Sequence, residues 1–107
     1  MRFLVTVAFI ACSLAAAQAQ AADSSCLSSI AAEDSAKVQT ENYVVKFRTA
    51  ATNLRTGPGL GYCVDDIETS KGKEVRVVGS IVTWLKIQRG DKVLWVHRSL
   101  VAGSPEL

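Results

Sequence analysis

Asn53-Leu54-Arg55-Thr56-Gly57-Pro58-Gly59, followed by Leu60-Gly61-Tyr62, is the stretch around which the rest of this 107-residue chain is arranged. Leu54 is an apolar residue between two polar ones, and the glycines and the proline after it force the backbone through turns that other residues adopt only at a cost. A helix cannot cross this stretch. We therefore expect a strand to end near Arg55 and another to begin near Tyr62, with an irregular loop between them.

Short runs in which apolar and polar residues alternate flank this loop. Five such runs occur, at 43–48, 62–68, 74–78, 84–88 and 93–96. Within one of them, Leu85 and Ile87 share a face that we expect to point inward, and Trp84 lies on the other face. Gly90 and Asp91 suit a tight hairpin turn between the last two runs. Five strands with turn signals every ~10 residues predict an all-β fold, a small barrel or sandwich.

The first part of the chain, residues 1–21, has the pattern of a secretory signal peptide. Arg2 precedes an uncharged apolar run that is shorter than the ~20 residues of a membrane span, and small residues close the run. We expect cleavage there and a periplasmic or secreted protein without stable membrane insertion. In the alternative, Phe9-Ile10-Ala11-Cys12 is a lipoprotein box with an acylated cysteine. Residues 22–42, which are acidic and rich in Ser and Ala, predict a flexible arm before a domain at 43–103.

Two cysteines would remain after export, Cys26 and Cys63. In an oxidising compartment an even pair favours a disulfide. Two free thiols are an alternative, and so is a reactive thiol, which would need His97, the single histidine, as its base. One histidine and no C-x-x-C motif do not fit a zinc site.

This chain has few of the residues that catalysis requires. A triad needs a base, an acid and a nucleophile together, and the glycine stretch lacks the Lys-Ser/Thr ending of a phosphate loop. The side chains of Asp65, Asp66 and Glu68 are expected to alternate between the two faces of a strand. We therefore interpret them as a solvated edge of the sheet rather than as an acid–base pair. The Arg89-Gly90-Asp91 triplet fits a hairpin turn better than an adhesion motif. We expect no enzymatic activity, no cofactor and no metal.

Four ordered motifs resemble those of bacterial Src homology 3 domains. They are N-L-R-T-G-P-G at 53–59, K-G-K-E-V at 71–75, T-W-L-K-I at 83–87 and L-W-V-H-R-S-L-V at 94–101. The resemblance covers about residues 43–101. Leu85, Leu94 and Leu100 depart from it, since the family usually has an aromatic residue, a glycine and a tyrosine there.

This resemblance implies a five-stranded barrel of the Src homology 3 type, with a ligand groove between the glycine-rich loop and the last strands. The groove residues that it implies are Pro58, Tyr62, Trp84, Trp95, His97 and Leu100. Two exposed tryptophans would form an apolar patch of the kind that marks binding sites. The alternative is that one or both indoles cap the core.

Charge adds one indication about the partner. Between Tyr43 and Val101 there are ten Lys and Arg residues and five Asp and Glu residues. The resulting net positive charge attracts anionic polymers. Nucleic acid is not expected outside the cytoplasm. We therefore expect a monomeric, exported, non-catalytic module that binds peptidoglycan or another cell-envelope peptide. The alternative is an adaptor or inhibitor of an exported partner such as a wall hydrolase.

Overall fold

The structure, a computed structural model, describes residues 25–103. The expected signal peptide at 1–21, its cleavage site and the alternative lipoprotein box lie outside the described residues. Within 25–103 the chain forms a short helix, α2 (Ala32–Ser35), a 3-10 helix, η3 (Arg98–Leu100), and seven strands. The strands are β1 (Gln39–Phe47), β2 (Thr52–Arg55), β3 (Val64–Glu68), β4 (Glu74–Ile81), β5 (Trp84–Arg89), β6 (Lys92–His97) and β7 (Val101–Ala102). The expected all-β class is confirmed.

All seven strands belong to one sheet with the order β3-β2-β6-β5-β4-β1-β7, in which neighbours are antiparallel. Because β3 and β7 are its two edges, the sheet is not closed. The expected count of five strands is therefore too low. A bend fixed by a 2.8 Å hydrogen bond between the hydroxyls of Thr49 and Thr52 separates β2 from β1, and the short β7 follows η3.

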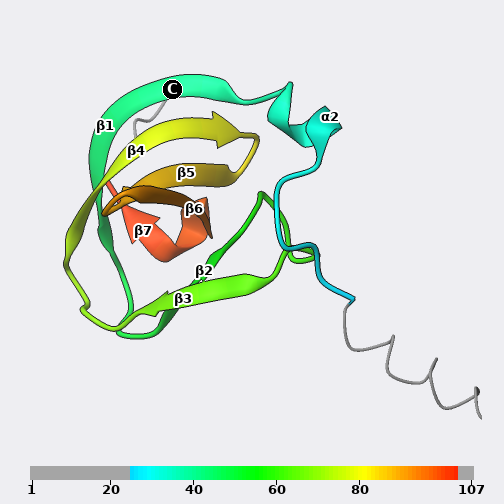
Figure 1. Ribbon diagram of the computed structural model, residues 1–107. Coiled ribbons are helices and arrows are strands. Elements are labelled where there is room, and N and C mark those ends of the chain that lie inside the picture. Colours follow the sequence, from blue (N-terminus) through cyan, green and yellow to red (C-terminus); the bar gives the residue numbers. More distant parts are fainter. Residues whose placement is uncertain (1–24, 104–107) are drawn as a thin grey trace, which may run out of the picture.

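Three strands, β4, β5 and β6, form a continuous meander at the centre of the sheet (Figure 1). The register of β5 and β6 runs without a break from Trp84 opposite His97 to Arg89 opposite Lys92. Gly90 in the connecting turn has a φ of 66°, a left-handed conformation that glycine adopts without strain. The hairpin expected at this position is confirmed.

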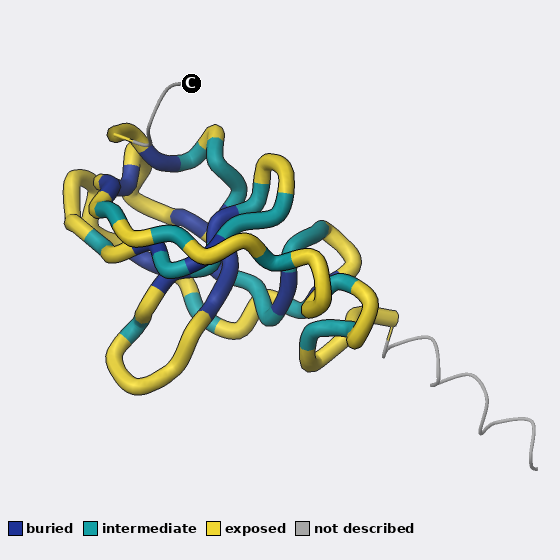
Figure 2. Tube along the Cα trace, turned by 90° about the horizontal axis from the view of Figure 1, so that it is seen from above, coloured by how far each residue is buried: buried dark blue, intermediate teal, exposed yellow. Residues whose placement is uncertain are grey.

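The core lies on one face of the curved sheet, and Figure 2 shows the buried positions gathered inside the trace while most turns are exposed. The core side chains are Val45, Phe47, Leu54, Val77, Leu85, Ile87, Leu94, Val96 and Val101. Alternation along the strands explains this set, since Leu85 and Ile87 are inward as expected and Lys86 between them is not. Burial of these apolar side chains is the main source of stability.

The segment before β1 is attached to the sheet. Cys26 and Cys63 form the expected disulfide, and Leu27 makes a parallel β-bridge with Tyr62. In Figure 1 the segment runs from α2 past the connection between β2 and β3. The expectation of a flexible arm is corrected for residues 25–42, because the disulfide ties this segment down and β1 already begins at Gln39.

Candidate functional site

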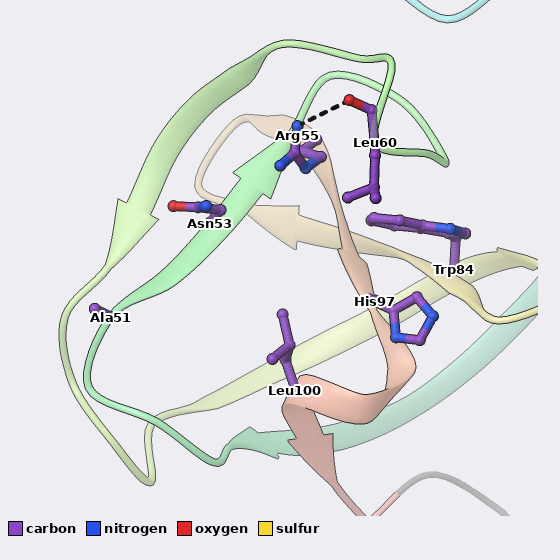
Figure 3. Close-up of a pocket in the computed structure, with 7 residues that line it drawn as sticks. All are labelled: Ala51, Asn53, Arg55, Leu60, Trp84, His97 and Leu100. Carbon is purple, nitrogen blue, oxygen red and sulfur yellow. Dashed lines mark hydrogen bonds between the residues drawn. The ribbon is translucent and has the colours of Figure 1, made fainter.

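A pocket of about 540 Å³ opens on the face of β2, β5 and β6 that is opposite the core (Figure 3). Its lining consists of Ala51, Asn53, Arg55, Leu60, Trp84, His97 and Leu100. The residues come from β2, from the loop after it, from the paired strands β5 and β6, and from η3. Segments that are far apart in the sequence therefore meet at one place.

Strand alternation delivers the side chains to this pocket. On β2, Leu54 is completely buried in the core, so its neighbours Asn53 and Arg55 project from the other face. On β5, Leu85 is buried and Trp84, before it, projects into the pocket. We call residues 56–63 the glycine loop; it contributes Leu60, whose side chain is 78% exposed and lies next to the indole in Figure 3.

Trp84 and His97 are direct cross-strand partners. Their rings meet edge to face, with centroids 5.1 Å apart and planes at 85°, an arrangement favourable for aromatic pairs. The backbone N–H of Ser99 donates to Nδ1 of His97 over 3.2 Å, and the Ser99 hydroxyl lies 2.8 Å from the same nitrogen. Because Nδ1 accepts a hydrogen bond, the neutral ring carries its proton on Nε2. The ring is thus held in one orientation beside the indole.

Arg55 supplies the positive charge of the pocket. Its Nη1 donates to the carbonyl of Tyr62 over 2.8 Å and to that of Leu60 over 3.3 Å, so it links β2 to the glycine loop. Within residues 25–103 no carboxylate pairs with Arg55, and no Asp or Glu belongs to the pocket lining. A guanidinium in this setting is suited to bind a carboxylate of a ligand.

Three of the six residues expected in a groove lie together in the pocket: Trp84, His97 and Leu100. Trp95, Tyr62 and Pro58 do not line it. The loop from Pro58 to Tyr62, which is expected to form part of the groove, contributes Leu60, whereas sequence reasoning missed Ala51, Asn53 and Arg55. A signal for two of them was present, because Asn53 and Arg55 alternate with the buried Leu54.

Trp95 is on the same face as His97 but is only 2% exposed. It sits in the middle of the sheet, with Lys86 opposite it on β5 and Arg55 opposite it on β2. Trp84 lies instead at the start of β5, next to a turn. The two tryptophans therefore have different environments, and only Trp84 is available in the pocket.

Tyr62 fastens the N-terminal segment to the glycine loop. Its hydroxyl donates to Oδ2 of Asp34 over 2.6 Å and accepts from the backbone N–H of Ala31 over 3.0 Å. The hydrogen bond to Asp34 raises the pKa of the Tyr62 hydroxyl. A Cβ at Gly57 would lie 2.4 Å from the ring of Tyr62, so only glycine permits this packing. Tyr62 is a buried structural residue rather than a lining residue of the pocket.

A second hollow, of about 390 Å³, lies between β3, β4 and the turn joining β5 to β6, and we call it the charged hollow. Its lining residues are Asp66, Lys73, Glu74, Val75, Gln88, Arg89, Gly90 and Lys92. Arg89 pairs with Glu68 through Nη1 and with Asp66 through Nε, the latter over 3.1 Å. Because its guanidinium is engaged with these carboxylates, the Arg89-Gly90-Asp91 triplet is not presented as an adhesion motif.

Glu68 corrects the expectation of a solvated acidic edge, since its side chain is 3% exposed. Its carboxylate accepts from Arg89 and from the backbone N–H of Ser70, the latter over 2.8 Å, and Lys73 lies 3.7 Å away. The hydrogen bond from Arg89, with smaller help from the other two, lowers the pKa of Glu68 to about 2. The carboxylate therefore stays ionised despite its burial.

Among residues 25–103, no cluster of three or more His, Cys, Asp or Glu side chains has an arrangement that would hold a metal ion. In the same part of the chain, no helix has the length and apolar character needed to cross a membrane. No protein-family model, curated protein or solved structure matches the chain. The functional conclusion therefore depends on the pocket.

Proposed function

We propose that this chain is an exported, non-catalytic binding module with a fold of the bacterial Src homology 3 type, and that its pocket binds a cell-envelope peptide such as a peptidoglycan stem or cross-bridge. The observation that carries the proposal is that Trp84 and Arg55 line the same pocket. Trp84 is half-exposed, and Arg55 has no carboxylate partner in the described chain. One group offers an apolar surface and the other offers a charge.

The size and composition of the pocket support a small ligand segment. About 540 Å³ is within the range of ligand sites, which is roughly 300–1,000 Å³. Leu60, Trp84 and Leu100 form an apolar lining around a few polar groups. Half-exposed aromatic residues of this kind contribute strongly to peptide binding. An apolar side chain of the peptide would pack between Leu60 and the indole.

Arg55 supports an acidic ligand in particular. Both of its hydrogen bonds within residues 25–103 use Nη1, so Nε and Nη2 keep their donors for a ligand. A guanidinium binds a carboxylate through two parallel hydrogen bonds. Peptidoglycan peptides carry free carboxylates, and they fit this requirement together with the apolar contact at Trp84.

The placement of the four motifs supports the proposed fold type. The first covers β2 and the glycine loop, the second leads into β4, the third covers β5, and the fourth runs from β6 through η3 to β7. Each motif thus includes or leads into a strand, and the first, third and fourth supply Arg55, Trp84 and His97 to the pocket.

Co-sedimentation with purified sacculi over a series of salt concentrations tests the proposal. We expect the mature protein to pellet with sacculi, and we expect Trp84→Ala and Arg55→Gln to remain in the supernatant while keeping the circular dichroism of the wild type. Ile67→Ala and Arg76→Gln are matched controls, because Ile67 is an exposed apolar residue on β3 and Arg76 an exposed cation on β4, both outside the pocket lining.

Two results would contradict the proposal. If the wild-type protein does not pellet at any salt concentration, peptidoglycan is not the ligand, and binding to a purified exported protein would favour the adaptor or inhibitor alternative. If it pellets and neither Trp84→Ala nor Arg55→Gln weakens the binding, the site lies elsewhere on the protein.

A further inference from the structure

We infer that the N-terminal segment (residues 25–38) positions one side of the pocket, and that the Cys26–Cys63 disulfide makes ligand binding sensitive to thiols. The inference rests on the proposed function, since it concerns the affinity of that same pocket. Neither the segment nor the disulfide lines the pocket. Their effect would pass through the glycine loop.

The first step is the attachment of the segment to the glycine loop. Leu27 donates its backbone N–H to the carbonyl of Gly61 over 2.9 Å and accepts from the N–H of Cys63 over 3.0 Å. The hydroxyl of Thr56 also donates to the carbonyl of Leu27 over 2.7 Å. With the disulfide beside them, these bonds fasten both ends of the glycine loop to one residue of the segment.

The second step is Tyr62, which connects the segment to Gly57 near the start of the loop. Its hydroxyl is held by Asp34 and Ala31, and its ring packs directly on Gly57. The position of the ring therefore sets the position of the glycine backbone above it. Loss of Asp34 or of the hydroxyl would release the ring from α2.

The third step leads from the loop to the pocket. Arg55 donates to the carbonyls of Leu60 and Tyr62, so these two carbonyls of the loop hold the guanidinium in position. Leu60, on the same loop, forms the side of the pocket that faces Trp84 (Figure 3). A displaced loop would move the charged group and one apolar group of the site together, whereas Trp84 and His97 are fixed by the pairing of β5 with β6.

The disulfide is accessible to exchange. Cys26 is exposed and Cys63 is half-buried, so a thiolate can reach the sulfur of Cys26. A thiolate of a dithiol attacks Sγ of Cys26, the bond between the two cysteines breaks, and Cys63 leaves as a thiolate that takes up a proton. The second thiol of the reagent then resolves the mixed disulfide, which leaves two protein thiols and an oxidised, disulfide-bonded reagent.

Reduction should affect affinity more than folding. The core cluster contains none of the residues 25–38, so the sheet keeps its apolar contacts when the segment is released. The ligand would then have to order the loop on binding, and a preorganised site avoids this cost. We expect binding to sacculi to weaken by about tenfold, within the ordinary range of coupling between sites.

The first experiment compares oxidised protein with protein reduced by dithiothreitol, at a temperature well below both values of Tm. Binding to sacculi is measured by co-sedimentation, and amide hydrogen exchange is followed at the same time. We expect faster exchange at Cys63, whose N–H bonds Leu27, unchanged exchange in β5, and about tenfold weaker binding. Equal binding of both forms would overturn the inference and leave the proposed function standing.

The second experiment uses variants that keep the disulfide. Tyr62→Phe and Asp34→Ala should weaken binding, whereas Asp34→Asn should restore much of it because the amide oxygen can still accept from the tyrosine. Glu41→Ala is the matched control, since Glu41 on β1 also accepts a side-chain hydrogen bond from a distant segment, the hydroxyl of Ser80 on β4, and is not part of the glycine loop or of the N-terminal segment. If Tyr62→Phe and Asp34→Ala lower Tm and leave affinity unchanged, their role is only structural and the inference is wrong.

The two proposals fail in distinguishable ways. Absence of pelleting by the oxidised wild-type protein counts against the proposed function, whatever the state of the loop. Pelleting that depends on Trp84 but not on Tyr62, Asp34 or the disulfide counts against the inference alone.

Discussion

The pocket and the charged hollow are both lined by charged residues, yet their cations have different partners within residues 25–103. In the charged hollow, Arg89 and Lys92 each pair with a carboxylate on β3. In the pocket, Arg55 bonds only backbone carbonyls within the described residues 25–103, and the indole of Trp84 is part of the same lining. The charged hollow thus holds ion pairs within the chain, and under the proposed function the guanidinium of Arg55 is the charge that meets a ligand.

This difference shows why the charge of the whole domain is a weak guide to function. The excess of Lys and Arg in the sequence does not reveal which cations are already neutralised. The pairs on β3 account for Lys73, Arg89 and Lys92, and among the other cations Arg55 is the one that lines the pocket. Changes in the charged hollow should therefore alter stability, and changes in the pocket should alter binding.

The largest effect is expected from Glu68→Gln. This change leaves the guanidinium of Arg89 without its buried partner, and loss of one member of a buried pair costs about 3 kcal/mol in the free energy of unfolding. Urea denaturation followed by circular dichroism measures it. The control is Glu74→Gln, which removes an exposed carboxylate from the hollow that Arg89 lines; if both variants lose the same stability, burial is not the source of the effect.

Lowering the pH should test the contribution of the Glu68 carboxylate to stability without a mutation. The folded-state pKa of Glu68 is about 2, against a usual value of 4.5. A lowered folded pKa means that the stabilisation is complete above pH 4.5 and is lost as the pH falls toward 2. Thermal unfolding across this window should show a fall in Tm that is smaller in Glu68→Gln than in the wild type. An identical fall in both proteins would contradict the assignment.

Much of the fold could be predicted from the sequence because alternation is a local property. Leu54, Leu85 and Ile87 are buried as their spacing indicates, and the turn at Gly90 lies where expected. The burial of Trp95 could not be predicted in this way. It shares the outward face with Trp84 and His97, and only the register with β2 and β5 places it in the middle of the sheet.

The pocket was only partly predictable for a related reason. Trp84, His97, Leu100 and the loop from Pro58 to Tyr62 are expected together, whereas Arg55 joins them because β2 pairs with β6. Which residue of the loop lines the pocket is set by how the loop folds. That folding depends on Asp34 and Cys26, which lie in a region with the composition of a linker. The disulfide could be expected from counting cysteines, whereas the hydrogen bonds of Tyr62 gave no signal in the sequence.

A smaller effect is expected from Arg55→Lys, which sharpens the contrast between a guanidinium and a simple charge. Lysine keeps the charge but cannot form two parallel hydrogen bonds with a carboxylate, so binding to sacculi should weaken by about tenfold, or about 1.4 kcal/mol. Co-sedimentation at fixed salt measures the change, and Arg76→Lys is the control. If Arg55→Lys binds as well as the wild type, the pocket offers only a diffuse positive field.

The smallest effect is expected from Asp65→Asn, at the exposed ion pair between β3 and β6. Lys92 Nζ lies 2.8 Å from Oδ2 of Asp65, but the two side chains are 53% and 40% exposed. Water screens such a pair in the folded protein and solvates both groups after unfolding, so exposed pairs contribute little to stability. We expect the Tm of the variant to be lower than that of the wild type by less than about 3 °C. At high salt we expect the two proteins to have the same Tm. A fall as large as that of Glu68→Gln would mean that the two pairs act as one network, and that exposure does not separate the stabilising charges of this hollow from the others.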